Sequence, residues 1–246
     1  MTPILMNALR LMREIGITQG FELYPVIPNV QLQAQISAES GTNRMIRETL
    51  LRLFRRARII SLASASFGFL TSDSSRALRL LVDAHLHEIR RTVPDSLHVK
   101  SLLLHEILTE LMVSFKLTDI TLDYIDYVRT YAGIMPGFVT RNFVMFVDFV
   151  NKLGTSLDDV VVLTPLNALG YQMNPSKEAC ERVLAQTKGL NVVAMSVMAG
   201  GQLSLASAVK YIESLPRQVS CVVGVSSSVH ARETFGALRN SFHEKI

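Results

Sequence analysis

The segment CVVGVSSSVHARETF, residues 221–235, carries the clearest chemical signal of this sequence. An apolar run and a glycine precede three consecutive serines, and an apolar helical spacing follows them. A serine in front of a helix caps it, and the remaining N–H groups of the first turn favour an anion. We therefore expect Ser226 or Ser227 to cap a helix and a phosphate group to bind at its start. Capping alone is the alternative.

A second loop, which contains two glycines, agrees with this interpretation. The apolar run NVVAMSVMAGG, residues 191–201, ends in glycines that let a ligand approach the backbone. A Gly201→Glu change is expected to block the ligand and to leave the melting temperature nearly unchanged. The residues expected to hold a phosphate group or a nucleotide cofactor are Gly200, Gly201, Ser226, Ser227, Ser228 and Arg232.

Polar residues also follow other apolar runs. Neutral donors and acceptors suit a sugar, an amide or a nucleoside better than they suit hydrolysis by paired carboxylates. His105 is the candidate acid–base residue, and a structural core histidine is the alternative. Glu106 follows on the same strand and is expected to point to the opposite face. Asn174 and Pro175 are interpreted as the start of a helix. The candidate substrate-binding residues, expected to line one cavity with His105 and Ser226, are Thr140, Asn142, Thr164, Asn167 and Ser196.

Seven strand-like apolar runs alternate with amphipathic helical stretches, and a helix at residues 4–15 precedes the first run. Repeated β-then-α units predict parallel strands, and many such units in one chain predict a closed barrel. The expected fold is therefore α/β, a TIM-type (β/α)8-like barrel that lacks its first β-strand, in one domain over residues 1–246. Successive runs should be neighbouring strands. The runs are residues 21–28, 57–65, 99–107, 135–142, 159–167, 191–201 and 219–227.

Four of these segments resemble aldo-keto reductases. NVVAMSVMAGGQLS is similar to the seventh-strand segment of that family, and GVSSSVHARE is similar to its phosphate-binding eighth-strand turn. FVTRNF resembles the end of the fifth strand, and LLLHE places His105 where the family keeps its active-site histidine. The resemblance, over about residues 97–240, implies a barrel, NADP as cofactor and carbonyl reduction. The family's catalytic lysine, aspartate and tyrosine have no equivalents here, so the resemblance supports the fold and the anion site more than the reaction.

Composition narrows the class of protein. Hydrophobic residues make up 48% of the chain and charged residues 19%, with a net charge of +4, which is typical of a well-buried globular domain. No stretch reaches the roughly 18 uncharged apolar residues of a membrane span. Cys180 and Cys221 are too few for a disulfide framework or a zinc cage. The arginines of residues 42–58 are interpreted as a solvated helix face, with a nucleic-acid contact as the alternative.

These observations predict a cytoplasmic enzyme that binds a phosphate-bearing substrate or a nucleotide cofactor. The alternative is a barrel without catalytic activity that binds a ligand or a partner. No metal, nucleic acid or membrane is expected to bind, and a homo-oligomer is compatible with the sequence.

Overall fold

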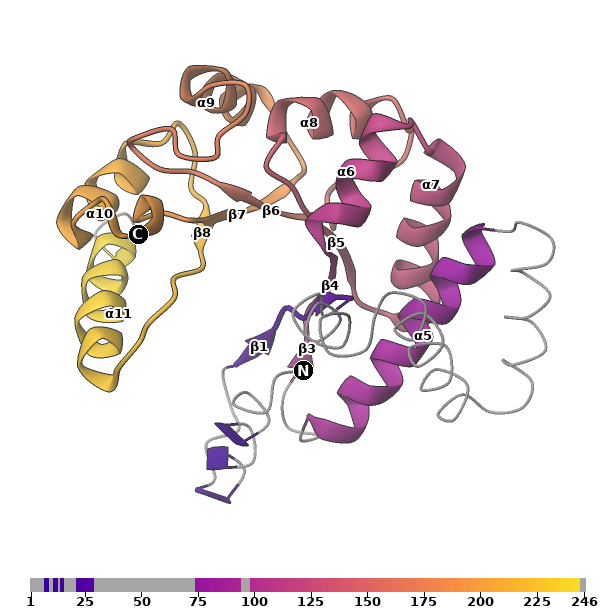
Figure 1. The fold of residues 1–246 in the computed structure, drawn as a ribbon, viewed down its shortest axis with the longest axis horizontal. Coiled ribbons are helices and arrows are strands. Elements are labelled where there is room, and N and C mark those ends of the chain that lie inside the picture. Colours follow the sequence, from indigo (N-terminus) through magenta and orange to yellow (C-terminus); the bar gives the residue numbers. More distant parts are fainter. Residues whose placement is uncertain are drawn as a thin grey trace, which may run out of the picture. The chain divides into compact units, whose positions relative to one another are not determined.

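The structure is a computed structural model, and it describes residues 7–8, 11–12, 14–15, 21–28, 74–93 and 98–243. The chain divides into two compact units (Figure 1). Unit 1 comprises Met1–His105 and Leu117–Gly137, and unit 2 comprises Glu106–Lys116 and Phe138–Ile246. The single domain over residues 1–246 stays a prediction.

Parallel strands alternate with helices along the chain, which confirms the α/β class. The hydrogen-bonded order is β2-β4-β5-β6-β7-β8, and the pairs β2–β4, β6–β7 and β7–β8 are parallel. Each described run contains one of these strands. Their bounds are Val26–Ile27 for β2, Ser101–Leu104 for β4, Met135–Val139 for β5, Val161–Pro165 for β6, Asn191–Met195 for β7 and Ser220–Cys221 for β8.

One expected neighbour relation is wrong. Val26 pairs directly with Leu103, and Ile27 pairs with Leu104, so no strand lies between β2 and β4. The run at residues 57–65, which was expected between them, lies outside the described residues. One more hydrogen bond extends the pairing of β2 with β4, since the N–H of His105 donates to the carbonyl of Ile27 at 2.7 Å.

In unit 1, a short parallel pair joins β1 (Glu22–Leu23) to β3 (His98–Val99). Tyr124 on helix α7 is fully buried, and its hydroxyl donates to the carbonyl of Leu102 in β4 at 2.6 Å, so this hydrogen bond joins α7 to β4. The helices of this unit are α5 (Ser74–Thr92), α7 (Thr118–Asp126) and the π-helix η1 (Tyr127–Ala132). The described residues 7–8, 11–12 and 14 are also helical, as expected for residues 4–15.

In unit 2, helices α8 and α9 lie on the same side of β6 and β7 (Figure 1). The rings of Phe138 and Phe146 lie 5.2 Å apart, and Leu184 is fully buried. Burial of each such side chain contributes about 1.5–3 kcal/mol. The helices are α6 (Glu106–Ser114), α8 (Phe143–Asn151), α9 (Lys177–Gln186), the 3-10 turn η2 (Ala199–Gly201), α10 (Leu205–Ser214) and α11 (Ser228–His243).

Two expectations, for Asn174 and for Glu106, are wrong because α9 and α6 begin at other positions than expected. Helix α9 is capped by Ser176, whose Oγ accepts the N–H of Ala179 at 3.2 Å, and not by Asn174. Ser176 has extended backbone angles, so its hydroxyl can reach the third N–H of the helix. Glu106 is the first residue of α6 and not part of a strand, because β4 ends at Leu104. An acidic side chain in the first turn is favoured by the helix dipole.

Among the described helices, none has the length and apolar character needed to cross a membrane.

Candidate functional site

A cavity of about 540 Å³ opens in unit 2 between the loop after β7 and the first turns of α11. It combines an apolar wall with hydroxyl, imidazole and carboxylate groups, which is the usual make-up of a small-molecule site. Helix α10 and the loop after β8 complete its walls. The lining residues are Met198, Leu205, Gly224, Val225, Ser226, His230, Glu233 and Thr234.

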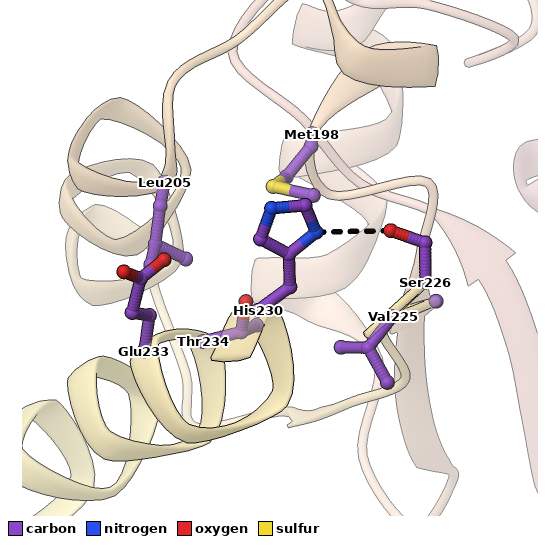
Figure 2. Close-up of a pocket in the computed structure, with 8 residues that line it drawn as sticks. Met198, Leu205, Val225, Ser226, His230, Glu233 and Thr234 are labelled. Atoms are coloured by element: carbon purple, nitrogen blue, oxygen red, sulfur yellow. Dashed lines mark hydrogen bonds between the residues drawn. The ribbon is translucent and has the colours of Figure 1, made fainter. Parts of the chain in front are cut away.

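The serine cluster shapes the polar end of this cavity. Ser227 caps α11, because its Oγ accepts the N–H of His230 at 3.1 Å, which confirms one of the two expected caps. Ser226 Oγ and His230 Nδ1 share a hydrogen bond of 2.9 Å. Figure 2 shows the imidazole ring with Ser226 on one side and Leu205 and Glu233 on the other. The first-turn N–H groups of Ser228 and Val229 have no partner within the helix itself, so this end carries partial positive charge.

The loop after β7 forms the opposite wall through Met198. Four residues of this loop have left-handed backbone angles, with φ of 53° at Ser196, 49° at Ala199, 69° at Gly200 and 90° at Gly201. Residues with side chains are strained in this region, and such strain is often found at functional sites. The expectation that Gly201→Glu leaves stability unchanged is therefore wrong, since a side chain at φ 90° is strained wherever it points.

The glycines of this loop are not in the cavity lining. A Cβ on Gly200 would lie 3.8 Å from the ring of Tyr171, and a Cβ on Gly201 would meet no atom within 4 Å. Ser228 and Arg232 are exposed on α11 and also lie outside the lining. Of the six residues expected to bind phosphate, Ser226 lines the cavity and Ser227 orients the helix that forms it.

A second polar cluster lies where β5 ends. The carboxylate of Glu110 on α6 accepts the Thr140 hydroxyl at 2.7 Å, the Arg141 N–H at 3.1 Å and the Asn142 side-chain amide at 2.7 Å. Thr140 is fully buried, and its Oγ1 also accepts the N–H of Asn142 at 2.9 Å. Arg141 pairs with Glu106, with Nε and Oε2 3.0 Å apart. The cluster fixes the start of α8, and it directs Thr140 towards a helix.

The remaining strand-end candidates have different surroundings. Asn167 is fully buried, and its side chain bonds both the N–H and the carbonyl of Tyr171, at 2.8 and 2.9 Å, so it closes the loop after β6. The hydroxyl of Thr164 is buried without a hydrogen-bond partner. Ser196 begins the strained loop after β7, and its carbonyl accepts the N–H of Ala199 at 2.7 Å. Contact of these residues with a substrate stays a prediction.

His105 directly follows β4 and belongs to unit 1, where it is half-buried. Its position at the C-terminal end of a strand is as expected, and its acid–base role stays a prediction. Among the described residues, no group of three histidine, cysteine, aspartate or glutamate side chains has an arrangement that could hold a metal ion.

The sequence interpretation missed His230, Glu233 and Glu110, which lie beside the predicted residues in the two polar clusters. His230 lies four residues after Ser226, and this i, i+4 spacing across a helix start was a usable signal. Glu233 lies one helical turn further. Glu110 gave no such signal, because its partners are about 30 residues away along the chain.

Comparison of the chain with protein-family models, with curated proteins and with solved structures gives no match.

Proposed function

We propose that this chain binds a small molecule that carries a phosphate group on a hydroxylated frame, such as a sugar phosphate or a nucleotide. The site is the cavity between the loops after β7 and β8. The observation that carries the proposal is the hydrogen-bonded pair Ser226–His230 at the start of α11, within a cavity of about 540 Å³. Cavities of this size are typical of small-molecule sites.

The polar and apolar groups that line the cavity suit the parts of such a ligand. Ser226, His230 and the start of α11 supply donors and partial positive charge for phosphate oxygens. Glu233 is an acceptor and would repel a bare anion, but it can accept hydrogen bonds from hydroxyl groups. Met198, Leu205 and Val225 provide an apolar wall for carbon atoms.

The proposal includes a TIM-type (β/α) barrel for the whole sheet. Barrels of this type frequently bind phosphate with the loops after their seventh and eighth strands, which are the positions of β7 and β8 in the expected numbering. The resemblance to aldo-keto reductases makes NADP a suitable first probe. Reduction of a carbonyl with NADP is the less favoured form of the proposal, because the family's lysine and tyrosine have no equivalents here.

A second candidate function is ligand binding without turnover. Thr140, Asn142 and Asn167 are occupied by hydrogen bonds within the chain, to Glu110 or to Tyr171. A substrate that used these groups would have to displace bonds that hold the fold. This observation favours a barrel that binds a ligand or a partner over one that converts a substrate at the strand ends.

Isothermal titration calorimetry and thermal shift with inorganic phosphate, ribose 5-phosphate, ribose and NADPH test the proposal. We expect the phosphorylated compounds to bind and ribose to bind weakly. A ligand at about 100 times its Kd stabilises the fold by about 2.7 kcal/mol. Loss of one charged hydrogen bond costs about 1.5–3 kcal/mol, so His230→Gln should weaken binding about tenfold or more.

Two further variants sharpen the result. Glu233→Ala should weaken the binding of ribose 5-phosphate and strengthen the binding of inorganic phosphate, because it removes a hydroxyl acceptor and a repelling charge together. His87→Gln is the matched control, since His87 is exposed on α5 in the other unit. Absence of binding by all phosphorylated probes would contradict the proposal, and so would binding that tolerates both His230→Gln and Ser226→Ala.

A further inference from the structure

Helix α6 exposes an apolar stripe on unit 2. Ile107 and Leu111 on α6 and Phe115, which directly follows it, are 51%, 45% and 70% exposed and recur every four residues. The N–H of Phe115 donates to the carbonyl of Leu111 at 3.0 Å, so the three side chains lie along one face. The helix buries a different set, Thr109, Met112 and Val113, against its own unit. The apolar stripe is therefore additional to the face that the fold already uses.

The size of the stripe is typical of an interaction surface. Three large side chains at these exposures present on the order of 300 Å² of apolar area, which is the size of the largest exposed apolar patch on a typical monomer, and such a patch is often functional. Met145 on the neighbouring helix α8 is 54% exposed and adds to the apolar area on this unit. Two such patches bury on the order of 600 Å² between them, below the roughly 1,200 Å² of stable interfaces, which is the size of weak and transient contacts.

The spacing of the stripe is self-complementary. When two copies of α6 pack antiparallel about a twofold axis at Leu111, each Ile107 lies opposite Phe115 of the second copy, and the two Leu111 side chains meet. A bulky aromatic then faces a smaller aliphatic side chain at both ends. An isologous dimer needs this property, because the same patch must fit itself.

The charges at the ends of the stripe are complementary in the same arrangement. Glu106 begins α6, and Lys116 lies two residues beyond its end with a φ of 52°, so the axis at Leu111 brings the acidic start of each α6 near the basic residue that follows the second copy. Glu106 already pairs with Arg141, and a lysine on its other side would extend that ion pair into a network. Antiparallel helices also place opposite dipole ends next to one another.

We infer that the apolar stripe of α6 is a docking surface for a second copy of this chain, in a symmetric dimer that dissociates on dilution. This inference is independent of the proposed ligand site, because none of its residues lines the cavity.

Analytical ultracentrifugation of the full chain over a wide concentration range tests the inference. The wild type should change from monomer to dimer as the concentration rises. Leu111→Glu brings two carboxylates together at the axis, and like charges at an interface cost several kcal/mol, so the dimer should weaken at least about tenfold. Leu111 is half exposed, so circular dichroism and melting of the variant monomer should match those of the wild type.

A matched control is Phe235→Glu, because Phe235 is 52% exposed on α11 and lies outside the stripe. It should leave the dimer intact, whereas Phe115→Glu should dissociate it. Leu111→Cys should form a cross-linked dimer under mild oxidation, and Phe235→Cys should not. A wild type that stays monomeric at every concentration overturns the inference, as does a dimer that survives Leu111→Glu. Higher oligomers, or binding of a different protein by this stripe in place of self-association, would also overturn it.

Discussion

Removal of the Glu110 carboxylate is the most direct test of how the end of β5 is held. In Glu110→Ala, three donors lose their acceptor: the Thr140 hydroxyl, the Arg141 N–H and the Asn142 amide. Each buried donor left unsatisfied costs about 1–3 kcal/mol. Thr140 is fully buried, while Asn142 is half-buried and water can partly replace its lost bond. We therefore expect a loss of about 3–4 kcal/mol in the free energy of unfolding.

This loss is large compared with the stability of a domain, which is about 5–15 kcal/mol. Urea denaturation with linear extrapolation should show it as a lower midpoint, and the melting temperature should fall by on the order of 10 °C. Glu110→Gln keeps one carbonyl acceptor, and a flipped Asn142 amide can accept from its new amine, so about 1 kcal/mol is expected.

The matched control is Asp148→Asn on α8, which removes an ion pair to Lys152 whose side chains are 67% and 70% exposed. An exposed pair contributes about 0–1 kcal/mol, so this variant should resemble the wild type. If Glu110→Ala loses no more than Asp148→Asn, the cluster does not hold the start of α8, and the three hydrogen bonds have been overvalued.

Two other predictions concern stability. Gly201→Ala should lower the free energy of unfolding by about 1–2 kcal/mol, because φ is 90° at this position. Gly224 has open space around it and no positive φ, so Gly224→Ala should be neutral or stabilising. Equal losses for the two variants in urea denaturation would contradict this prediction. Burial raises the pKa of the Cys180 and Cys221 thiols to about 11, so the folded state holds protons that the unfolded state releases above about pH 8.5. Stability should therefore fall as pH rises from about 8.5 to about 11, by at most about 1.4 kcal/mol per pH unit for each thiol, and Cys221→Ala should reduce the slope in melting curves. A slope unchanged by this substitution would refute the assignment for Cys221.

The sequence was sufficient for the class of the fold and for the approximate position of each described strand. Residues 161–165 and 191–195 are rich in β-branched and apolar side chains, and they pair in parallel as expected. The ends of the runs were less predictable. Glu106 belongs to a helix and Val222–Ser226 to a loop, because hydrogen bonding to neighbours, and not side-chain type, decides where a strand stops.

The neighbour relations of the strands could not be read from chain order alone. The apolar runs at 21–28 and 99–107 are separated by a third run, and yet β2 pairs with β4. Sequential strands are neighbours in only about two-thirds of cases, and nothing in the composition of residues 57–65 marks an exception. The closure of the sheet into a barrel stays part of the proposal for the same reason.

The two polar clusters explain why the predicted residue Ser226 lines a cavity, whereas the predicted residues Thr140 and Asn142 are bonded within the fold. At both places, polar side chains follow a strand of the sheet, which is the pattern that the sequence interpretation used. At the end of β5, Glu110 of α6 reaches these side chains and accepts their hydrogen bonds. At the end of β8, the hydroxyl and imidazole of Ser226 and His230 bond each other and still border a cavity. The same strand-end pattern therefore leads to a cavity at the end of β8, whereas at the end of β5 the polar groups are already satisfied by hydrogen bonds to Glu110.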